Sequence, residues 1–170
     1  MPEPLGLESG VVRVVPYDNR WPKLFAEEAT RIRAACALPL RLEHIGSTAI
    51  PGLDAKPVLD ILAGHPTAAS PFDYVDPLAR AGYEHRGDAG IPDHQFFRRG
   101  QPRAYHIHLV VADGPLWRDY IGFRDLLRSD PDVARRYAEL KLALAAQFPR
   151  DRAAYIEGKS AFVRALIQAR

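Results

Sequence analysis

The sequence predicts an α+β fold, a small mixed β-sheet with helices packed on it and a C-terminal helical segment. Short apolar runs bounded by glycine and proline precede Pro115, and amphipathic helical patterns follow it. The chain has 170 residues, of which 47% are hydrophobic and 26% charged, as in soluble globular proteins. This length suits one well-packed domain. Strands followed by helices indicate the α+β class.

Residues 1–10 are expected to be a flexible N-terminus, and residues 11–170 a single domain. The first residues lack the apolar core of a signal peptide, and no later run has the length of a membrane span, so we expect a cytoplasmic protein with no membrane partner. The formal net charge is +2, and the basic residues are dispersed among acids without a recognition motif. No nucleic-acid partner is therefore expected.

The elements follow from apolar spacing and from breaker residues. Strands are expected at 11–15, 41–46, 57–63, 94–99 and 103–112, the last two forming an antiparallel hairpin. Helices are expected at 16–38, 70–82, 115–130, 131–148 and 150–170. The only cysteine, Cys36, is in register with apolar residues of the first helix, which favours a place in the core over a reactive thiol.

The stretch "EHIGSTAIPGLDAKPVLDI" carries the first chemical signal. Gly46 and Ser47 follow a strand, where glycine allows close approach of a ligand and the hydroxyl and amides can bind phosphate. Asp60 lies in the middle of the next apolar strand, where an ionised carboxylate needs a cation or hydrogen bonds. A divalent metal held against a phosphate meets that need. A turn cap, or an ion pair with Lys56 or an arginine, meets it equally well.

Two histidines on a later strand supply a second signal. His106 and His108 are two residues apart, so both imidazoles face one side of the sheet. Together with Asp60 they would form a two-histidine, one-carboxylate set suited to a transition metal or zinc, or a base beside a phosphate. The alternative is a pair of hydrogen-bonded histidines on a partly buried sheet face.

The other histidines carry less information. His44, two residues before the Gly-Ser pair, is expected to share the face of the site, and Glu43 then points to the opposite side. His85 and His94 lie in loop-like sequence and receive no role.

The stretch quoted above, followed by "YHIHLVV", "FRDLLRSDP", "YAELK" and "YIEGK", resembles the GrpB family of the nucleotidyltransferase superfamily. The resemblance covers residues 12–169, nearly the whole chain. It implies a nucleotidyltransferase-type sheet, with Gly46, Ser47 and Thr48 at the phosphates of a nucleotide and Asp60 as a ligand of Mg²⁺ or Mn²⁺.

The chain also departs from the superfamily's pattern. A second acid is usual two residues beyond the metal-binding aspartate, where this chain has Leu62. A third acid usually comes from a neighbouring strand, where His106 and His108 stand instead. These two histidines are therefore candidate metal ligands and catalytic residues with Asp60, and zinc binding through them is an alternative to Mg²⁺ or Mn²⁺.

Basic residues are needed to bind the anion. Lys56, just before the Asp60 strand, is the first choice for a phosphate contact, and Arg124, within the family-like "FRD", is the second. Lys141 and Lys159 each lie one helical turn beyond a tyrosine, and helix packing or contact with that tyrosine is the preferred explanation.

These features predict a protein that binds a nucleoside triphosphate with a divalent metal and transfers a nucleotidyl or phosphoryl group to an unknown acceptor. The residues expected to perform the chemistry are Asp60, His106 and His108. The alternative is a binding module that retains a nucleotide or a coenzyme-A-like ligand without transforming it. The leucine at position 62 favours the binding module, and the two histidines favour chemistry.

Overall fold

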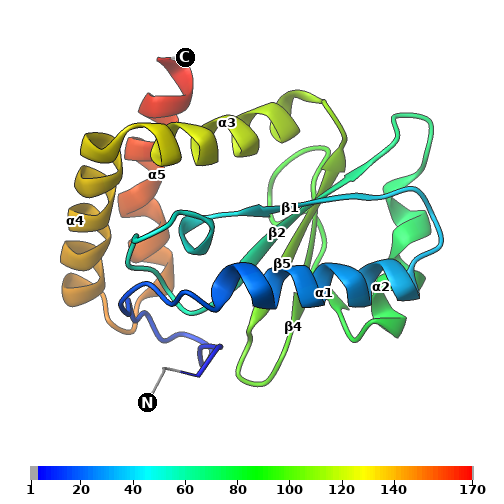
Figure 1. Cartoon of the computed structure of the whole chain (residues 1–170), viewed down its shortest axis with the longest axis horizontal. Helices are drawn as coiled ribbons and strands as arrows, with labels where there is room; N and C mark the ends of the chain where they lie inside the picture. The colour runs from blue at the N-terminus through cyan, green and yellow to red at the C-terminus, as the bar shows by residue number, and fades with distance from the viewer. Residues whose placement is uncertain (1–3, 170) are drawn as a thin grey trace.

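A five-stranded mixed sheet forms the centre of the computed structural model, which describes residues 4–169 (Figure 1). Its spatial order is β1-β2-β5-β4-β3. Only β2 and β5 are parallel neighbours, and the other pairs are antiparallel. The strands span Arg41–Ile45 (β1), Leu59–His65 (β2), Glu84–His85 (β3), Gln95–Arg99 (β4) and Tyr105–Val111 (β5).

Five α-helices and two short 3₁₀ helices surround the sheet. The α-helices span Trp21–Ala35 (α1), Val75–Arg80 (α2), Pro115–Ser129 (α3), Pro131–Gln147 (α4) and Arg152–Gln168 (α5). The 3₁₀ helices span Ser47–Ala49 (η1) and Pro71–Tyr74 (η2). No helix within residues 4–169 combines the length and apolar character needed to cross a membrane.

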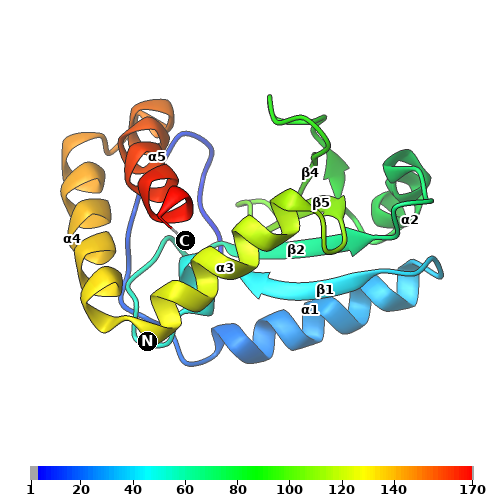
Figure 2. The same ribbon diagram turned by 90° about the horizontal axis from the view of Figure 1, so that it is seen from above.

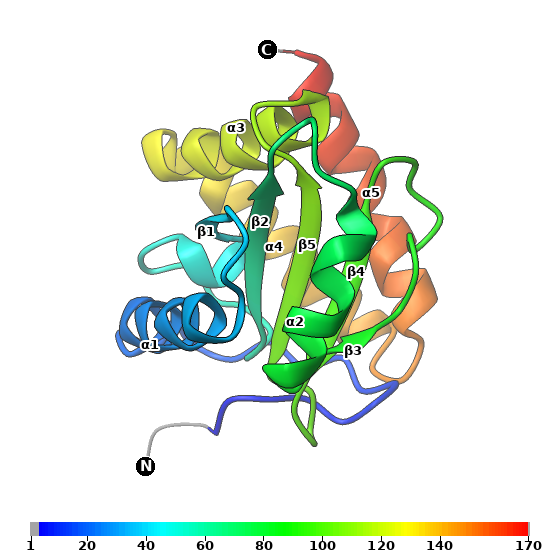
Figure 3. The same cartoon turned by 90° about the vertical axis from the view of Figure 1, so that its right-hand side faces the viewer.

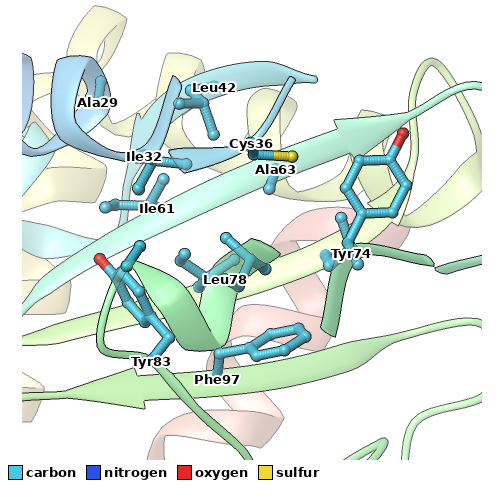
Figure 4. Packing of buried hydrophobic residues seen from close by; sticks show 13 residues of the cluster. Ala29, Ile32, Cys36, Leu42, Ile61, Ala63, Tyr74, Leu78, Tyr83 and Phe97 are labelled. Carbon is cyan, nitrogen blue, oxygen red and sulfur yellow. The ribbon is translucent and has the colours of Figure 1, made fainter. Parts of the chain in front are cut away.

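The main core lies between the sheet and the layer formed by α1 and α2 (Figure 4). Alternate residues of β2 and β5, such as Ile61 and Ile107, point into it. Ile32 from α1 and Leu78 from α2 meet them, and all four side chains are fully buried. Cys36 belongs to the same cluster and is 5% exposed, so its predicted place in the core is confirmed.

The opposite face of the sheet is covered by α3 (Figure 3). Trp117 of α3 packs on Ile45, Leu62 and Val110, which come from three neighbouring strands. Gly64 is required beneath the indole, because a Cβ atom at this position would lie 2.6 Å from the ring. Helix α3 thus covers this face of the sheet, and its Tyr120 reaches His108 near Asp60.

Helices α4 and α5 pack on each other at the end of the sheet where β1 ends and β2 and β5 begin (Figure 2). A second apolar cluster joins them to α3 and to the loop after β1. In this cluster Tyr137 of α4 stacks on Phe162 of α5 with 5.6 Å between ring centroids. The same end of the sheet carries Gly46 and Asp60, so the C-terminal helices lie next to the predicted site.

A buried carboxylate ties α1 to the sheet. Glu28 is 3% exposed and accepts hydrogen bonds from the guanidinium groups of Arg31 and Arg99, the shortest being 2.6 Å from Arg99 Nη2 to Oε2. Tyr83 donates its hydroxyl to Oε1 at 2.7 Å. Burial opposes ionisation of Glu28, but these donors outweigh it and lower its pKa.

The structure corrects several predicted boundaries. Residues 11–15 do not form a strand, because only Val15 makes a bridge, to Ala55, while the amide of Val12 donates to Pro149. The helix predicted at 70–82 is divided into η2 and the shorter α2. The strand β3 was not expected, since two residues are too few for an apolar period.

Part of the segment predicted to be flexible contacts the domain. Leu7 is 3% exposed, and its amide donates to the carbonyl of Arg103. Residues 1–3 lie outside the described residues. The hairpin of β4 and β5 and the three C-terminal helices follow the prediction, apart from shifts of a few residues at their ends.

Candidate functional site

The turn after β1 brings Gly46 against the carboxylate of Asp60. Ile45 and Asp60 are paired in the antiparallel ladder of β1 and β2, so the residue after Ile45 lies beside the aspartate. Gly46 has φ +73° and ψ −176°, a backbone conformation that side chains other than glycine hardly adopt. A Cβ atom here would lie 2.7 Å from Asp60 Oδ2. Glycine is therefore required both by the backbone and by the carboxylate.

The other carboxylate oxygen, Asp60 Oδ1, is held by two imidazoles. His106 Nδ1 lies 3.1 Å and His108 Nε2 3.3 Å from it, because β5 is parallel to β2 and the three side chains share a face. Burial opposes ionisation, but the hydrogen bonds and charge of the two histidines outweigh it and hold the pKa of Asp60 well below its usual range. The side chain is 31% exposed, and Oδ2 accepts no hydrogen bond among residues 4–169.

His94 joins the site from the loop before β4, although sequence reasoning gave it no role. It is 1% exposed, and its Nε2 lies 3.0 Å from His108 Nδ1. The hydroxyl of Tyr120 on α3 lies 3.4 Å from the same nitrogen. No sequence signal marks His94, since its place depends on how the loop folds back over β5. The only pattern available was its position at the first residue of the strand predicted at 94–99.

The hydrogen-bond pattern fixes how protons are arranged along this chain of imidazoles. His94 Nδ1 lies 2.9 Å from the carbonyl of Asp88, which can only accept, so this nitrogen carries a proton. Burial lowers the pKa of His94 and favours its neutral form, whose Nε2 is an acceptor. His108 then donates from Nδ1 to His94. Its Nε2 donates to Asp60 as well only when both ring nitrogens are protonated.

His44 and Glu43 lie on the faces opposite to those predicted. His44 pairs with Ile61, points toward α1 and stacks on Phe25 with 4.9 Å between ring centroids. Burial lowers the pKa of His44 to about 4. The reason for the error is the ladder register: Ile45, not His44, is opposite Asp60, so the odd-numbered residues of β1 share its face.

The residues predicted at the phosphates differ in their access to solvent. Ser47 is half-buried, and its hydroxyl makes no hydrogen bond among the described residues. Thr48 is 2% exposed, and its hydroxyl lies 2.9 Å from His44 Nε2, so it is turned into the protein and away from a ligand. Arg124 is already paired, with Nη1 2.7 Å from Glu43 Oε2. Of these, only Gly46 and Ser47 are open to a phosphate.

Lys56 is half-buried, lies near Asp60 and contacts helix α5. Its ammonium group lies 5.3 Å from the ring centroid of Tyr155, and Lys159 Nζ lies 5.0 Å from the same ring. Lys141 Nζ lies 5.0 Å from the ring of Tyr137, which confirms the expected tyrosine contacts of both helical lysines.

The donor atoms that the described part of the chain places around Asp60 offer a metal ion an incomplete set of ligands. Within residues 4–169, no three His, Cys, Asp or Glu side chains are arranged to hold a metal ion by themselves. Asp60 Oδ2, which lies beside Gly46 and accepts no hydrogen bond among the described residues, fits one Mg²⁺ or Mn²⁺, since Mg²⁺ is commonly bound by one or two carboxylates together with phosphate oxygens and water. Metal ligation by His106 and His108 stays a prediction.

The fold is of nucleotidyltransferase type. Terminal uridylyl transferase 4 from Trypanosoma brucei, solved with bound dUTP, superposes with a TM-score of 0.50 at 14% identity, over 78% of this chain and 46% of that chain. The chain belongs to the GrpB protein family, which matches residues 11–169. The crystal structure of the conserved protein GrpB from Enterococcus faecalis is 30% identical, with a TM-score of 0.84 over 92% of this chain and 96% of that chain.

Relatives of known sequence include longer proteins. A UPF0157 protein of Pseudomonas aeruginosa is 45% identical over 165 residues, which cover 92% of this chain and 66% of the relative. A dephospho-CoA kinase of Mycolicibacterium paratuberculosis is 30% identical over 180 residues, covering 90% of this chain and 44% of the kinase. This chain thus spans about two thirds of the first relative and less than half of the second.

Proposed function

We propose that this protein binds a nucleoside triphosphate with one divalent metal ion and transfers a nucleotidyl or phosphoryl group to an acceptor. The observation that carries the proposal is Asp60, a partly exposed and ionised carboxylate with one oxygen held by two histidines and the other directed at a glycine turn. Such a carboxylate needs a partner cation, and the adjacent Gly46 and Ser47 offer room for the phosphate that brings it.

Asp60 Oδ2 would hold the metal ion, which supplies charge neutralisation at the phosphoryl oxygens when bound. The Gly46 turn and the Ser47 hydroxyl would orient the phosphate chain. His106, through its contact with Oδ1, keeps the carboxylate in position. The chain itself therefore provides binding and orientation, the terms that dominate phosphoryl-transfer catalysis.

His108 is suited to accept the proton of the acceptor. In neutral form it donates from Nδ1 to His94 and has a lone pair on Nε2; gaining a proton there adds a hydrogen bond to the Asp60 carboxylate. An acceptor hydroxyl that loses its proton attacks the phosphorus and an O–P bond forms. The P–O bond to the leaving group breaks, which releases pyrophosphate in nucleotidyl transfer and nucleoside diphosphate in phosphoryl transfer. His108 is more exposed than His106, with 17% against 7% of the side chain accessible.

A second candidate function is a binding module that retains a nucleotide or a coenzyme-A-like ligand without turnover. The observation that favours it is Leu62, which stands in place of a second carboxylate and is fully buried against α3. Asp60 is then the only acidic residue of β2, so this strand offers a single carboxylate to the site. The similarity to part of a dephospho-CoA kinase fits a ligand that contains a nucleotide.

The test is calorimetric binding of a panel of nucleoside triphosphates with Mg²⁺ or Mn²⁺, together with an assay for released pyrophosphate or nucleoside diphosphate. We expect Asp60→Asn to weaken metal-dependent binding at least tenfold. Asp132→Asn is the matched control, because the Asp132 side chain is 83% exposed on α4. Equal affinities of wild type and Asp60→Asn would refute the proposal. Binding without product release, with either metal, would favour the binding module.

A further inference from the structure

The distribution of lysine in this chain is uneven. Of its 23 basic residues only four are lysines, at positions 23, 56, 141 and 159, and all the others are arginines. Three of the four come together at one place from three separate elements: Lys56 from the loop before β2, Lys141 from α4 and Lys159 from α5. In addition to burial, the charge of Lys159 lowers the pKa of both Lys56 and Lys141, and the charge of Lys56 lowers that of Lys141.

The lysine cluster (Lys56, Lys141 and Lys159) is built around tyrosine rings. The ammonium groups of Lys56 and Lys159 both lie over the ring of Tyr155, at 5.3 and 5.0 Å from its centroid. Lys141 is 1% exposed and donates to the carbonyl of Asp54. Lys56 and Lys159 are half-buried, so these two can reach a ligand while Lys141 lies behind them.

The lysine cluster has no carboxylate in ion-pair contact. Among residues 4–169, no Asp or Glu oxygen lies within 4.0 Å of Lys56, Lys141 or Lys159, nor of the neighbouring Arg103 and Arg152. Several arginines elsewhere in the fold are paired with acids, as in the network around Glu28. Partly buried positive charges are costly without a counter-charge.

Unpartnered polar atoms accompany these charges. The Tyr155 hydroxyl is fully buried and has no hydrogen-bond partner within residues 4–169, although Lys56 and Lys159 both lie over its ring. Arg103 is 7% exposed, and its Nε and the Nε of Arg152 also lack partners. These donors and the ammonium groups are all suited to an anion.

The charges that surround Lys56 explain why lysine, rather than arginine, stands here. Burial lowers the pKa of Lys56 to about 7, helped by Lys159, Arg152 and Arg103 and opposed by Asp60. Burial likewise lowers the pKa of Lys141 to about 7, with Lys159 and Lys56 acting in the same direction and Asp54 against them. Lysine can lose its proton in such surroundings, whereas arginine stays charged.

We propose that Lys56 and Lys159, backed by Lys141, form a binding site for the terminal phosphates of a polyphosphate chain. The proposal deepens the function proposed above, because Asp60 is close enough to Lys56 to affect its pKa and one extended ligand can reach both. The substrate class is then a ligand with two or more linked phosphates. Lys159 acquires a binding role in addition to its contact with Tyr155.

The experiment measures binding of inorganic tripolyphosphate, pyrophosphate and orthophosphate by calorimetry in EDTA, so that neither a nucleoside nor a metal contributes. The variants are Lys56→Met and Lys159→Met, with Lys23→Met as the control, since Lys23 is 81% exposed on α1. We expect tripolyphosphate to bind the wild type more tightly than orthophosphate. Each cluster variant should lose at least tenfold in affinity, and the control should lose less than twofold.

Equal tripolyphosphate affinity of Lys159→Met and wild type would overturn the proposal, as would an absence of tripolyphosphate binding by the wild type. Lys159 is half-buried on the last helix, so this variant gives a result even if Lys56→Met does not fold. The outcomes also separate the two proposals. If nucleotides fail to bind the wild type but tripolyphosphate still binds Asp60→Asn, the proposed function is refuted and the phosphate site is retained. If Lys159→Met binds nucleotides with wild-type affinity, only the proposal of the phosphate site is refuted.

Discussion

Replacing Gly46 by alanine tests whether the turn after β1 is built around the Asp60 carboxylate. Two effects oppose the new methyl group. Its Cβ would lie 2.7 Å from Asp60 Oδ2, and the backbone has φ +73° and ψ −176°, which costs a non-glycine residue about 1–3 kcal/mol. The contact adds to this strain, because the carboxylate can move only by loosening its bonds to His106 and His108.

The matched control is Gly52→Ala. Gly52 also has a positive φ, +77°, but a Cβ at this position meets no atom within 4 Å, so only the backbone strain remains. We expect Gly52→Ala to lower the free energy of unfolding by about 1 kcal/mol. Gly46→Ala should lower it by about 3 kcal/mol, equivalent to a Tm decrease of roughly 6–12 °C for a chain of this size.

Two measurements check this prediction. Urea unfolding gives the free energies of both variants, and ¹H–¹⁵N spectra of the imidazoles report whether His106 and His108 still contact Asp60. We expect the imidazole signals to shift in Gly46→Ala and to stay unchanged in Gly52→Ala. If the two variants are equally stable within about 0.5 kcal/mol and have the same imidazole signals, the inferred contact between the turn and the carboxylate is wrong.

Three further predictions concern stability. Glu28→Gln should destabilise by about 2 kcal/mol at pH 7, because it removes the buried negative charge that accepts the hydrogen bonds of Arg31 and Arg99, whose side chains are 43% and 27% exposed. The pKa of Glu28 is lowered in the folded state, so this difference should shrink in urea unfolding as the pH falls below 4.5; a constant difference would contradict the assignment. The folded-state pKa of Lys141 is about 7 against 10.5 in the unfolded chain, so the unfolded state binds more protons between these values. Wild-type stability relative to Lys141→Met should therefore rise from pH 7 to 10, by about 1.4 kcal/mol per pH unit at most, and a flat or falling difference would count against this. Gly64→Ala should destabilise by about 1–3 kcal/mol through its contact with Trp117, and a gain in thermal stability would show that the indole can move aside.

Local patterns predicted much of the fold. The three C-terminal helices follow from amphipathic spacing and from prolines at the starts of α3 and α4 and shortly before α5, which are properties of neighbouring residues. The pairing of β4 with β5 follows from a short turn between two apolar runs. The valine-rich segment 11–15 had the composition of a strand, but it lacks a neighbour to pair with along its length, and a strand needs one.

The site was only partly predictable. Asp60, His106 and His108 were expected together because strand periodicity places the two imidazoles on one face, and the structure brings all three into contact. His44 was placed on the wrong face, since a ladder register cannot be read from one strand alone. His94 was missed, because a loop residue carries no periodicity to indicate where it points.

The sequence by itself determined which residues this protein has for its chemistry: an acid within an apolar strand, a glycine-serine turn and two histidines on one strand face. It did so because strand alternation and the cost of burying a charge are local properties. Tertiary structure alone decided that Gly46 lies against Asp60, that His94 contacts His108 and that lysines from three elements share one place. These contacts join residues far apart in the chain, and their geometry is set by sheet register and helix packing.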